Sequence, residues 1–271
     1  MKNRLFSESD LNFPNSRLSE SNDRPENRTV AEESPLEIIV NSHWSTVLMR
    51  TPGDEDVLIA GHLFAEGLIQ SHADIESISC QTYAGPFQTT GCRAQVRVRP
   101  ESQGLPSSTP CLASSGARIA TTDLQPNPIS RPATDEPHVE RSMLLWCHAD
   151  MVKHQPLYRL TRGMHGAALY KTDGGILGCC EDVGRHNAMD KVIGKGLMEA
   201  WPFEETIMVF SGRGSLEMVL KTVRAGVPVL VCTSAPTSLA VRAADTLGLT
   251  LVKPERSGGL TIFSHPNRIE D

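Results

Sequence analysis

The sequence has few aromatic residues and no long apolar segment. Phe, Trp and Tyr make up 5% of its 271 residues, and no stretch reaches the roughly 18 apolar residues that a membrane-spanning helix requires. The N-terminus lacks the apolar middle region of a signal peptide. No basic run interleaved with aromatics is present, and the formal charge of −6 disfavours broad nucleic-acid binding. We therefore expect a globular, cytoplasmic protein that binds neither membranes nor nucleic acids.

Motifs for metal binding, disulfide frameworks and common nucleotide sites are also missing. Neither CxxC nor HxxxH occurs, which argues against a zinc site, and GxxxxGK[ST] and GxGxxG are absent. The seven cysteines are odd in number and irregularly spaced, so we expect most of them to be reduced and buried. Cys111 differs, because it lies in a polar, proline-rich segment where a thiol is expected to be exposed and reactive.

Composition and hydrophobic patterning divide the chain into four parts. Residues 1–33 are rich in Ser, Asn, Glu and Arg, which predicts a disordered tail. Residues 34–99 contain short apolar strands and a helix that starts after Asp54, so a small N-terminal α/β lobe is expected. Residues 100–140 are rich in Pro and Ser and are expected to be a flexible loop that carries Cys111. Residues 141–271 are the expected α/β core domain.

Strands and helices alternate through the predicted core. Apolar strands are expected at 174–180, 206–211, 227–232 and 249–252, with helices at 184–198, 215–225 and 237–247. Helices that end at Gly and alternate with short apolar strands are typical of βαβ units and predict a mostly parallel sheet. Such sheets bind ligands at the carboxyl ends of their strands. The loops after Cys180, Phe210, Cys232 and Val252 are therefore expected to line one site.

Two of these loops place Gly-Arg between a strand and a helix, in Glu181–Asn187 (EDVGRHN) and Ser211–Ser215 (SGRGS). Unpaired backbone N–H groups, the positive end of a helix dipole and an arginine together suit a phosphate or another anion. Simpler alternatives remain open: Asp182 capping the first helix beside an Arg–Glu ion pair, and an ordinary turn with Arg213 in solvent. His165, in TRGMHGAAL, is interpreted as a satisfied core histidine.

Six segments of the chain resemble a known family. They are PLEIIVN, TRGMHGAAL, EDVGRHNAMDK, SGRGSLEMVLK, SAPTSLAV and LTLVKPERSGGLTIFSHPNRI, and they resemble the FdhD (NarQ) family of sulfur carrier proteins from about Glu33 to Ile269. The resemblance implies a cytidine-deaminase-like α/β core with a mostly parallel sheet, a smaller N-terminal α/β lobe, and a homodimer.

The resemblance also implies an activity, a sulfurtransferase required for molybdenum formate dehydrogenases. In the family, a cysteine desulfurase loads persulfide sulfur onto a carrier cysteine. The carrier passes it to the molybdenum bis(molybdopterin guanine dinucleotide) cofactor before insertion into apo formate dehydrogenase. By this resemblance Cys111 is the persulfide residue. The implied cofactor-binding residues are Arg185, His186, Ser211, Gly212, Arg213 and Ser215, together with Pro254, Glu255, Arg256, Ser257, Gly258 and Gly259.

Two segments depart from the family pattern. Members usually carry a CGxCG-like motif where this chain has PCLASSG, with one cysteine. Before the last strand the family has an aromatic-x-basic-x-Gly-basic contact, of which Arg256 and Gly258 remain. One alternative is therefore a non-catalytic chaperone that binds the cofactor without transferring sulfur. A nucleotide deaminase is disfavoured, because the HGA run at His165 lacks the glutamate of His-x-Glu and no Pro-Cys-x-x-Cys follows.

Overall fold

The computed structural model of the protein describes residues 12–13, 28–85, 87, 89–99 and 137–271. Cys111 and the other residues from 100 to 136 of the predicted loop lie outside this part of the chain. Within the predicted tail, β1 (Asn12–Phe13) and β2 (Arg28–Thr29) pair as two short antiparallel strands. None of the described helices is long and apolar enough to cross a membrane.

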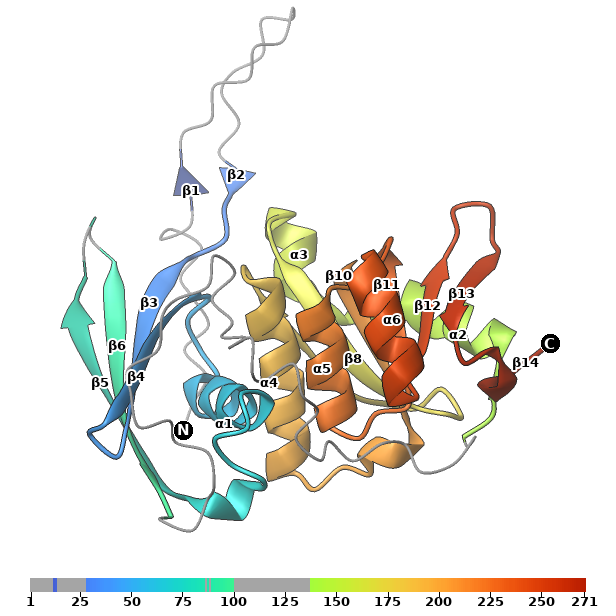
Figure 1. The fold of residues 1–271 in the computed structure, drawn as a ribbon. Coiled ribbons are helices and arrows are strands. Elements are labelled where there is room, and N and C mark those ends of the chain that lie inside the picture. The colour runs from blue at the N-terminus through green and yellow to red at the C-terminus, as the bar shows by residue number, and fades with distance from the viewer. Residues whose placement is uncertain (1–11, 14–27, 86, 88, 100–136) are drawn as a thin grey trace, which may run out of the picture.

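The N-terminal lobe is a four-stranded sheet with a helix on one face (Figure 1). Its strands, in spatial order, are β4 (Trp44–Arg50), β3 (Ser34–Val40), β6 (Thr90–Val98) and β5 (Ile75–Ala84), and its helix is α1 (Glu55–Ala65). Side chains along β6 alternate: Cys92, Ala94 and Val96 are buried, whereas Arg93 and Arg97 are exposed. The period of two gives the sheet one apolar face, which packs on α1.

The core domain is built on a six-stranded sheet. Its strands, in spatial order, are β13 (Leu260–Ser264), β12 (Thr250–Pro254), β11 (Val229–Ser234), β10 (Thr206–Arg213), β8 (His165–Lys171) and β9 (Ile176–Asp182). The pairings β10–β11 and β11–β12 are parallel, and the other pairings in this sheet are antiparallel. Because β8 runs antiparallel to both of its neighbours, β9, β10, β11 and β12 all point the same way.

Helices cover both faces of this sheet. The layer toward the N-terminal lobe contains α4 (Arg185–Met198), α5 (Leu216–Arg224) and α6 (Ser238–Leu247), which lie side by side in Figure 1. The opposite face packs on α2 (Arg141–Met151). Along β10, Met208 and Phe210 belong to the core shared with α4–α6, whereas Ile207 and Val209 belong to the core shared with α2. A buried strand of this kind is apolar on both faces.

Short elements complete the described fold. They are α3 (Pro156–Thr161), the two-residue strands β7 (Val139–Glu140) and β14 (Ile269–Glu270), which pair in parallel, and single 3-10 turns at 72–74, 152–154, 203–205 and 266–268. Pro156 stands at the first position of α3, where its missing N–H costs the helix nothing.

The two lobes share one hydrophobic core, and they meet where α1 crosses α4. A Cβ atom added at Gly61 of α1 would overlap the carbonyl oxygen of Asp190, and one added at Gly194 of α4 would overlap the carbonyl oxygen of Val57. Glycine at both positions therefore allows the two helix backbones to touch. The buried cluster runs without a break from Leu36 and Ile38 of the smaller sheet, through both helices, to the larger sheet.

Candidate functional site

The carboxyl ends of four strands meet at one edge of the larger sheet, as the sequence predicts. β9, β10, β11 and β12 all end there, and β8 begins there, because His165 is paired with Asp182 in the register of the sheet. The N-termini of α4, α5 and α6 follow directly after β9, β10 and β11. This edge is the upper end of the larger sheet in Figure 1. It brings together both Gly-Arg junctions and the start of β8.

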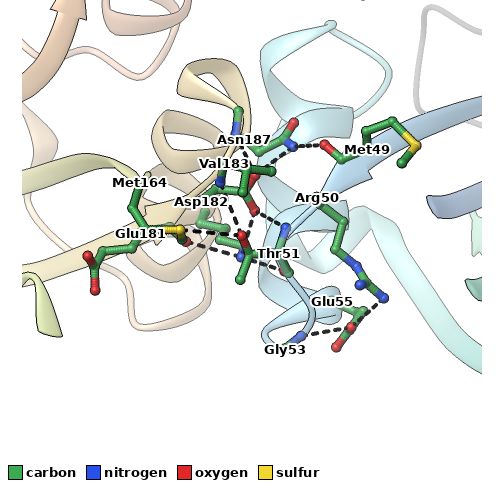
Figure 2. Close-up of polar contacts among 12 residues, drawn as sticks. Met49, Arg50, Thr51, Gly53, Glu55, Met164, Glu181, Asp182, Val183 and Asn187 are labelled. Atoms are coloured by element: carbon green, nitrogen blue, oxygen red, sulfur yellow. Dashed lines mark hydrogen bonds and ion pairs between the residues drawn. The ribbon is translucent and has the colours of Figure 1, made fainter. Parts of the chain in front are cut away.

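At the first junction, from β9 to α4, Asp182 is fully buried and anchors the turn. Its Oδ1 accepts hydrogen bonds from the backbone N–H of Gly184 and from Nδ2 of Asn187, both at 2.9 Å. Its Oδ2 accepts the N–H of Thr51 at 3.1 Å and lies 2.9 Å from Nζ of Lys191. The carboxylate is thus satisfied from both lobes, as a buried charge requires (Figure 2).

Three further bonds fix the same turn. Nδ2 of Asn187 also donates to the carbonyl oxygen of Met49 at 2.7 Å. Nζ of Lys191 donates to the carbonyl oxygens of Thr51 and Glu181, at 3.2 and 3.3 Å. The carboxylate of Glu181 accepts the N–H groups of residues 157 and 158 at the start of α3. The predicted alternative, Asp182 as a helix cap, is wrong: Gly184 occupies the N-cap position of α4, no side chain caps the helix, and Asp182 instead accepts the N–H of Gly184 itself.

Arg185 and His186 are the first two residues of α4. His186 is largely buried, and burial together with Lys221 and Arg185 lowers the pKa of its ring to about 3, so the ring is neutral at physiological pH. Its Nε2 lies 3.2 Å from Oε2 of Glu217 on α5, but not in hydrogen-bond geometry, and its Nδ1 has no partner in the structure. Because the His186 ring is neutral, its contact with Glu217 is not an ion pair.

Beneath His186 lies a second buried charge cluster that joins three helices. Nζ of Lys221 on α5 lies 2.5 and 2.7 Å from the two carboxylate oxygens of Asp190 on α4. Nδ1 of His62 on α1 lies 3.2 Å from the same carboxylate. These contacts hold α1, α4 and α5 together below the edge, and the positive charge of Lys221 is one reason that His186 stays neutral.

At the second junction, from β10 to α5, Ser211 bonds to the start of β8. Its Oγ accepts the N–H of Gly166 at 2.9 Å and lies 3.1 Å from Nδ1 of His165. Burial and the charge of Arg185 lower the pKa of His165, while Asp182 acts in the opposite direction. A neutral ring that accepts the Ser211 proton at Nδ1 carries its own proton at Nε2. The interpretation of His165 as a core histidine is thus wrong, because the residue lies half-buried at the site edge and not in the core.

The other residues predicted at this junction differ in their surroundings. Gly212 is buried against the ring of Phe210, and Arg213 is exposed. Ser215 occupies the N-cap position of α5, yet its buried hydroxyl has no hydrogen-bond partner and does not cap the helix. By contrast, the Thr237 hydroxyl accepts the N–H of Ala240 at 3.2 Å and caps α6. The start of α5 therefore carries no side-chain cap.

The segment 254–259 forms the turn between β12 and β13. Glu255 is held by Nζ of Lys253 and by the Thr261 hydroxyl, both at 2.6 Å, and its N–H donates to the carbonyl oxygen of Gly259. These two side-chain bonds lower the pKa of Glu255. Arg256 and the two residues after it are exposed. The turn lies at the same edge as Arg213 but two strands away, or about 10 Å along the sheet.

Several residues of this edge were not found by sequence reasoning. Thr51 was missed because nothing nearby in the sequence marks it, and Lys191, although it ends the EDVGRHNAMDK segment, was missed because its bond to Thr51 spans 140 positions. His165 was placed in the core because a single histidine carries no local signal of its partner Ser211. Among residues 12–13, 28–85, 87, 89–99 and 137–271, no group of three or more His, Cys, Asp or Glu side chains is placed to bind a metal.

Comparison with known proteins agrees with this arrangement. The FdhD/NarQ family model matches residues 31–270, which is most of the chain and includes every element of the site edge. The chain belongs to the FdhD/NarQ family.

The matches to relatives in that family extend over nearly the whole length of both chains. The chain is 37% identical over 258 residues to the sulfur carrier protein FdhD of Mycolicibacterium paratuberculosis, covering 91% of this chain and 93% of that protein. It is 35% identical over 263 residues to the sulfur carrier protein FdhD of Mycobacterium tuberculosis, covering 91% of this chain and 92% of that protein. Both relatives are named for carrying sulfur.

A solved structure shows the same fold. A protein from Desulfotalea psychrophila, described as a formate dehydrogenase accessory protein, superposes with a TM-score of 0.71 at 24% identity. The match covers 96% of this chain and 100% of that one. The mixed α/β fold class predicted from the sequence is confirmed. The larger sheet is parallel only at its centre, because β8, β9 and β13 join it by antiparallel pairing.

Five of the cysteines of this FdhD/NarQ chain that the structure describes are poor nucleophiles at neutral pH. Burial raises the pKa of Cys80, Cys147, Cys179 and Cys180 to about 12 and that of Cys232 to about 11. A thiolate, rather than a thiol, attacks a persulfide or disulfide. Cys179 and Cys180, the cysteines nearest the edge in sequence, are therefore packing residues, as the sequence predicted.

Proposed function

We propose that this protein is a sulfur carrier for the maturation of a molybdenum formate dehydrogenase. In this proposal it accepts sulfur from a cysteine desulfurase and delivers it to the molybdenum bis(molybdopterin guanine dinucleotide) cofactor, which it binds as a client. The observation that carries the proposal is the sheet edge where Arg185, the first residue of α4, and Arg213, the last residue of β10, come from strands on either side of β8, with uncapped helix N-termini beside them. The names of the relatives support the sulfur-carrying role.

The chemistry of the edge suits a nucleotide with several phosphates. α4 and α5 begin there without a side-chain cap, so their first N–H groups and the positive ends of their dipoles face the edge. Arg185 and Arg213 add guanidinium groups, which bind phosphates in bidentate fashion. From β9 to β12 the edge spans four strand spacings, or about 19 Å. This length can accommodate an extended dinucleotide.

The neutral ring of His165 complements these cations. Its Nε2–H donor is fixed by the Ser211 bond on the other side of the ring, so it offers one hydrogen bond without adding charge. A single neutral donor beside arginines suits the polar edge of a base or pterin better than a phosphate. The turn 254–259 lies at the far end of the same edge, where exposed Arg256 can contact a second nucleotide half.

The sulfur-carrying residue in this proposal is Cys111, which lies outside the described residues. Its thiolate attacks the terminal sulfur of the desulfurase persulfide; a new S–S bond forms on Cys111 as the desulfurase cysteine leaves as a thiolate. In the second step the S–S bond of the Cys111 persulfide breaks: the terminal sulfur passes to the reduced client cofactor, which supplies the two electrons, and Cys111 is released as a thiolate. The high pKa values of the five described cysteines with resolved shifts support this choice by making each of them a weak nucleophile.

A second candidate function is a cofactor chaperone that transfers no sulfur. It is favoured by one observation: the segment 110–116 contains a single cysteine. The two functions predict different results for the same variant. In a chaperone, Cys111→Ala keeps formate dehydrogenase maturation intact, whereas Arg185→Ala and Arg213→Ala abolish it.

The deciding experiment is mass spectrometry of the purified protein after incubation with a cysteine desulfurase and cysteine. We expect the mass to rise by one sulfur atom, and the modified peptide to contain Cys111. Cys111→Ala should lose the modification, while Cys179→Ala, a matched control at a buried thiol, should keep it. A wild-type protein that gains no sulfur, or gains it on another cysteine, contradicts the Cys111 relay.

A further inference from the structure

Thr51, at the end of β4 in the N-terminal lobe, bonds to the core domain through every polar group it has. It is 3% exposed. Its N–H donates to Oδ2 of Asp182 at 3.1 Å, and its carbonyl oxygen accepts Nζ of Lys191 at 3.2 Å. Its hydroxyl accepts the N–H of Val183 at 3.1 Å and points to the sulfur of Met164 at 3.8 Å (Figure 2).

The two residues that contact this hydroxyl, Val183 and Met164, each lie one or two positions before a residue of the proposed nucleotide-binding edge of the larger sheet, called here the nucleotide edge. Val183 comes two positions before Arg185, and Met164 comes directly before His165. His165 is paired with Asp182, three positions before Arg185, in the register of β8 and β9, so His165 and Arg185 lie at the same edge of the sheet. One hydroxyl from the N-terminal lobe therefore touches the backbone of Val183 and the side chain of Met164, the residues that lead into Arg185 and His165.

We propose that Thr51 is a positioning residue for the nucleotide edge, whose hydroxyl sets Arg185 and His165 relative to each other. The inference rests on the proposed function for what binds there. Thr51 does not contact the ligand in this proposal; it acts through Val183 and Met164. The N-terminal lobe thereby takes part in binding at a site built from core-domain residues.

The hydroxyl is the part of this network that can be removed without leaving a charge behind. Truncating Asp182 or Lys191 leaves the other ion buried and unpaired, which endangers the fold. Thr51→Val keeps the shape of the side chain and leaves only the neutral N–H of Val183 without its partner. Thr51→Ser keeps the hydroxyl and removes one methyl group. The pair therefore separates the hydrogen bond from packing.

The test measures binding and side-chain environment in the full-length chain. Isothermal titration calorimetry with GDP, a probe for the guanine nucleotide half of the client, gives the dissociation constant. Histidine ring NMR gives the pKa of His165, assigned by the loss of its signal in His165→Gln. Thr46→Val, on the same strand, is the matched control, and circular dichroism establishes that each variant is folded. Should Thr51→Val not fold, Thr51→Ala, which removes the same hydroxyl, takes its place.

We expect Thr51→Val to raise the dissociation constant of GDP about tenfold, which is about 1.4 kcal/mol of binding free energy, because Arg185 and His165 are no longer held in place for the ligand. The pKa of His165 should rise toward its ordinary value as Arg185 moves away from it. Thr51→Ser and Thr46→Val should match the wild type in both measurements. A merely structural role would lower stability without moving the His165 pKa.

Three results have distinct meanings. Wild-type affinity and an unchanged His165 pKa in Thr51→Val overturn the inference. Equal losses in Thr51→Val and Thr51→Ser also overturn it, because then the hydroxyl is not the cause. If the wild-type protein does not bind GDP, nucleotide binding at this edge fails, and the His165 pKa in the two variants still decides whether Thr51 positions these residues.

Discussion

The two Gly-Arg junctions look alike in sequence but are built in different ways. The β9–α4 junction is fixed by buried side chains, because Asp182 is bonded to Asn187, to Lys191 and to Thr51 of the other lobe. The β10–α5 junction has an exposed Arg213, and its Ser215 hydroxyl is buried without a partner. The polar groups of the first junction mostly stabilise the fold, whereas Arg213 of the second remains accessible to a ligand.

The difference shows that a short polar run at a strand end does not by itself reveal its use. In EDVGRHN, Asp182 and Asn187 bond to the N-terminal lobe and fix the turn that places Arg185 at the start of α4. In SGRGS, Ser211 organises His165, and the arginine and the helix start remain available. Substitutions at the first junction should therefore act mainly on stability, and those at the second mainly on binding.

The largest expected effect is at Asp182. Asp182→Asn removes the charge that neutralises Lys191 inside the protein, and we expect the free energy of unfolding to fall by about 3–5 kcal/mol. Urea unfolding followed by circular dichroism measures it. The double variant Asp182→Asn/Lys191→Met removes both ions and should recover part of the loss. A double variant less stable than Asp182→Asn would contradict the assignment of the ion pair as the cause.

The next largest effect is on the pH dependence of stability. It comes from His186, which lies where the two junctions approach each other. The folded protein holds the His186 pKa at about 3, whereas the unfolded chain has a pKa of about 6.5. The unfolded state then binds more protons, so stability is complete above pH 6.5 and falls as the pH drops from 6.5 toward 3. The slope is at most about 1.4 kcal/mol per pH unit.

His186→Gln should flatten that slope, because glutamine has no proton to gain. Urea unfolding at several pH values from about pH 4 to about pH 7 covers most of the range between the two pKa values. The same slope in wild type and His186→Gln would show that another group controls acid stability.

Arg213 gives a smaller change in stability and a clear change in binding. Arg213→Gln should leave the free energy of unfolding within about 0.5 kcal/mol of the wild type, since the side chain is exposed. The dissociation constant of GDP should rise about tenfold, because a hydrogen bond to a charged group is lost. Arg242→Gln, an exposed residue of α6, controls for net charge. Equal affinity in the two variants would remove Arg213 from the site.

The smallest effects separate the helix starts from each other. Thr237→Ala should destabilise the protein by about 1 kcal/mol, because it removes the hydroxyl that caps α6. Ser215→Ala should cost no more than about 0.5 kcal/mol, because its hydroxyl caps nothing in the structure. Thermal unfolding of both variants measures the difference. A larger loss for Ser215→Ala than for Thr237→Ala would show that Ser215 caps α5 after all.

Sequence reasoning located the core helices and the site edge, because hydrophobic periodicity and glycine stops are local signals. It missed β5, β8 and β13. β5 is largely exposed, and β8 begins His-Gly-Ala-Ala, without the β-branched residues that mark strands. The direction of β9 relative to β8 could not be predicted, because pairing is a property of the assembled sheet. The same holds for Thr51, whose role depends on contacts more than 110 positions away.

The glycine contact between α1 and α4 also bears on how this protein can be recombined with its relatives. Gly61 and Gly194 are complementary only to each other's backbones, so any larger residue at either position forces the helices apart. A chimera cut between the two lobes would pair an α1 from one parent with an α4 from another, and it would keep this contact only if both parents have glycine at these positions. In the design of a chimeric protein, α1 and α4 with their flanking strands should therefore come from the same parent, and the crossover should lie outside this segment.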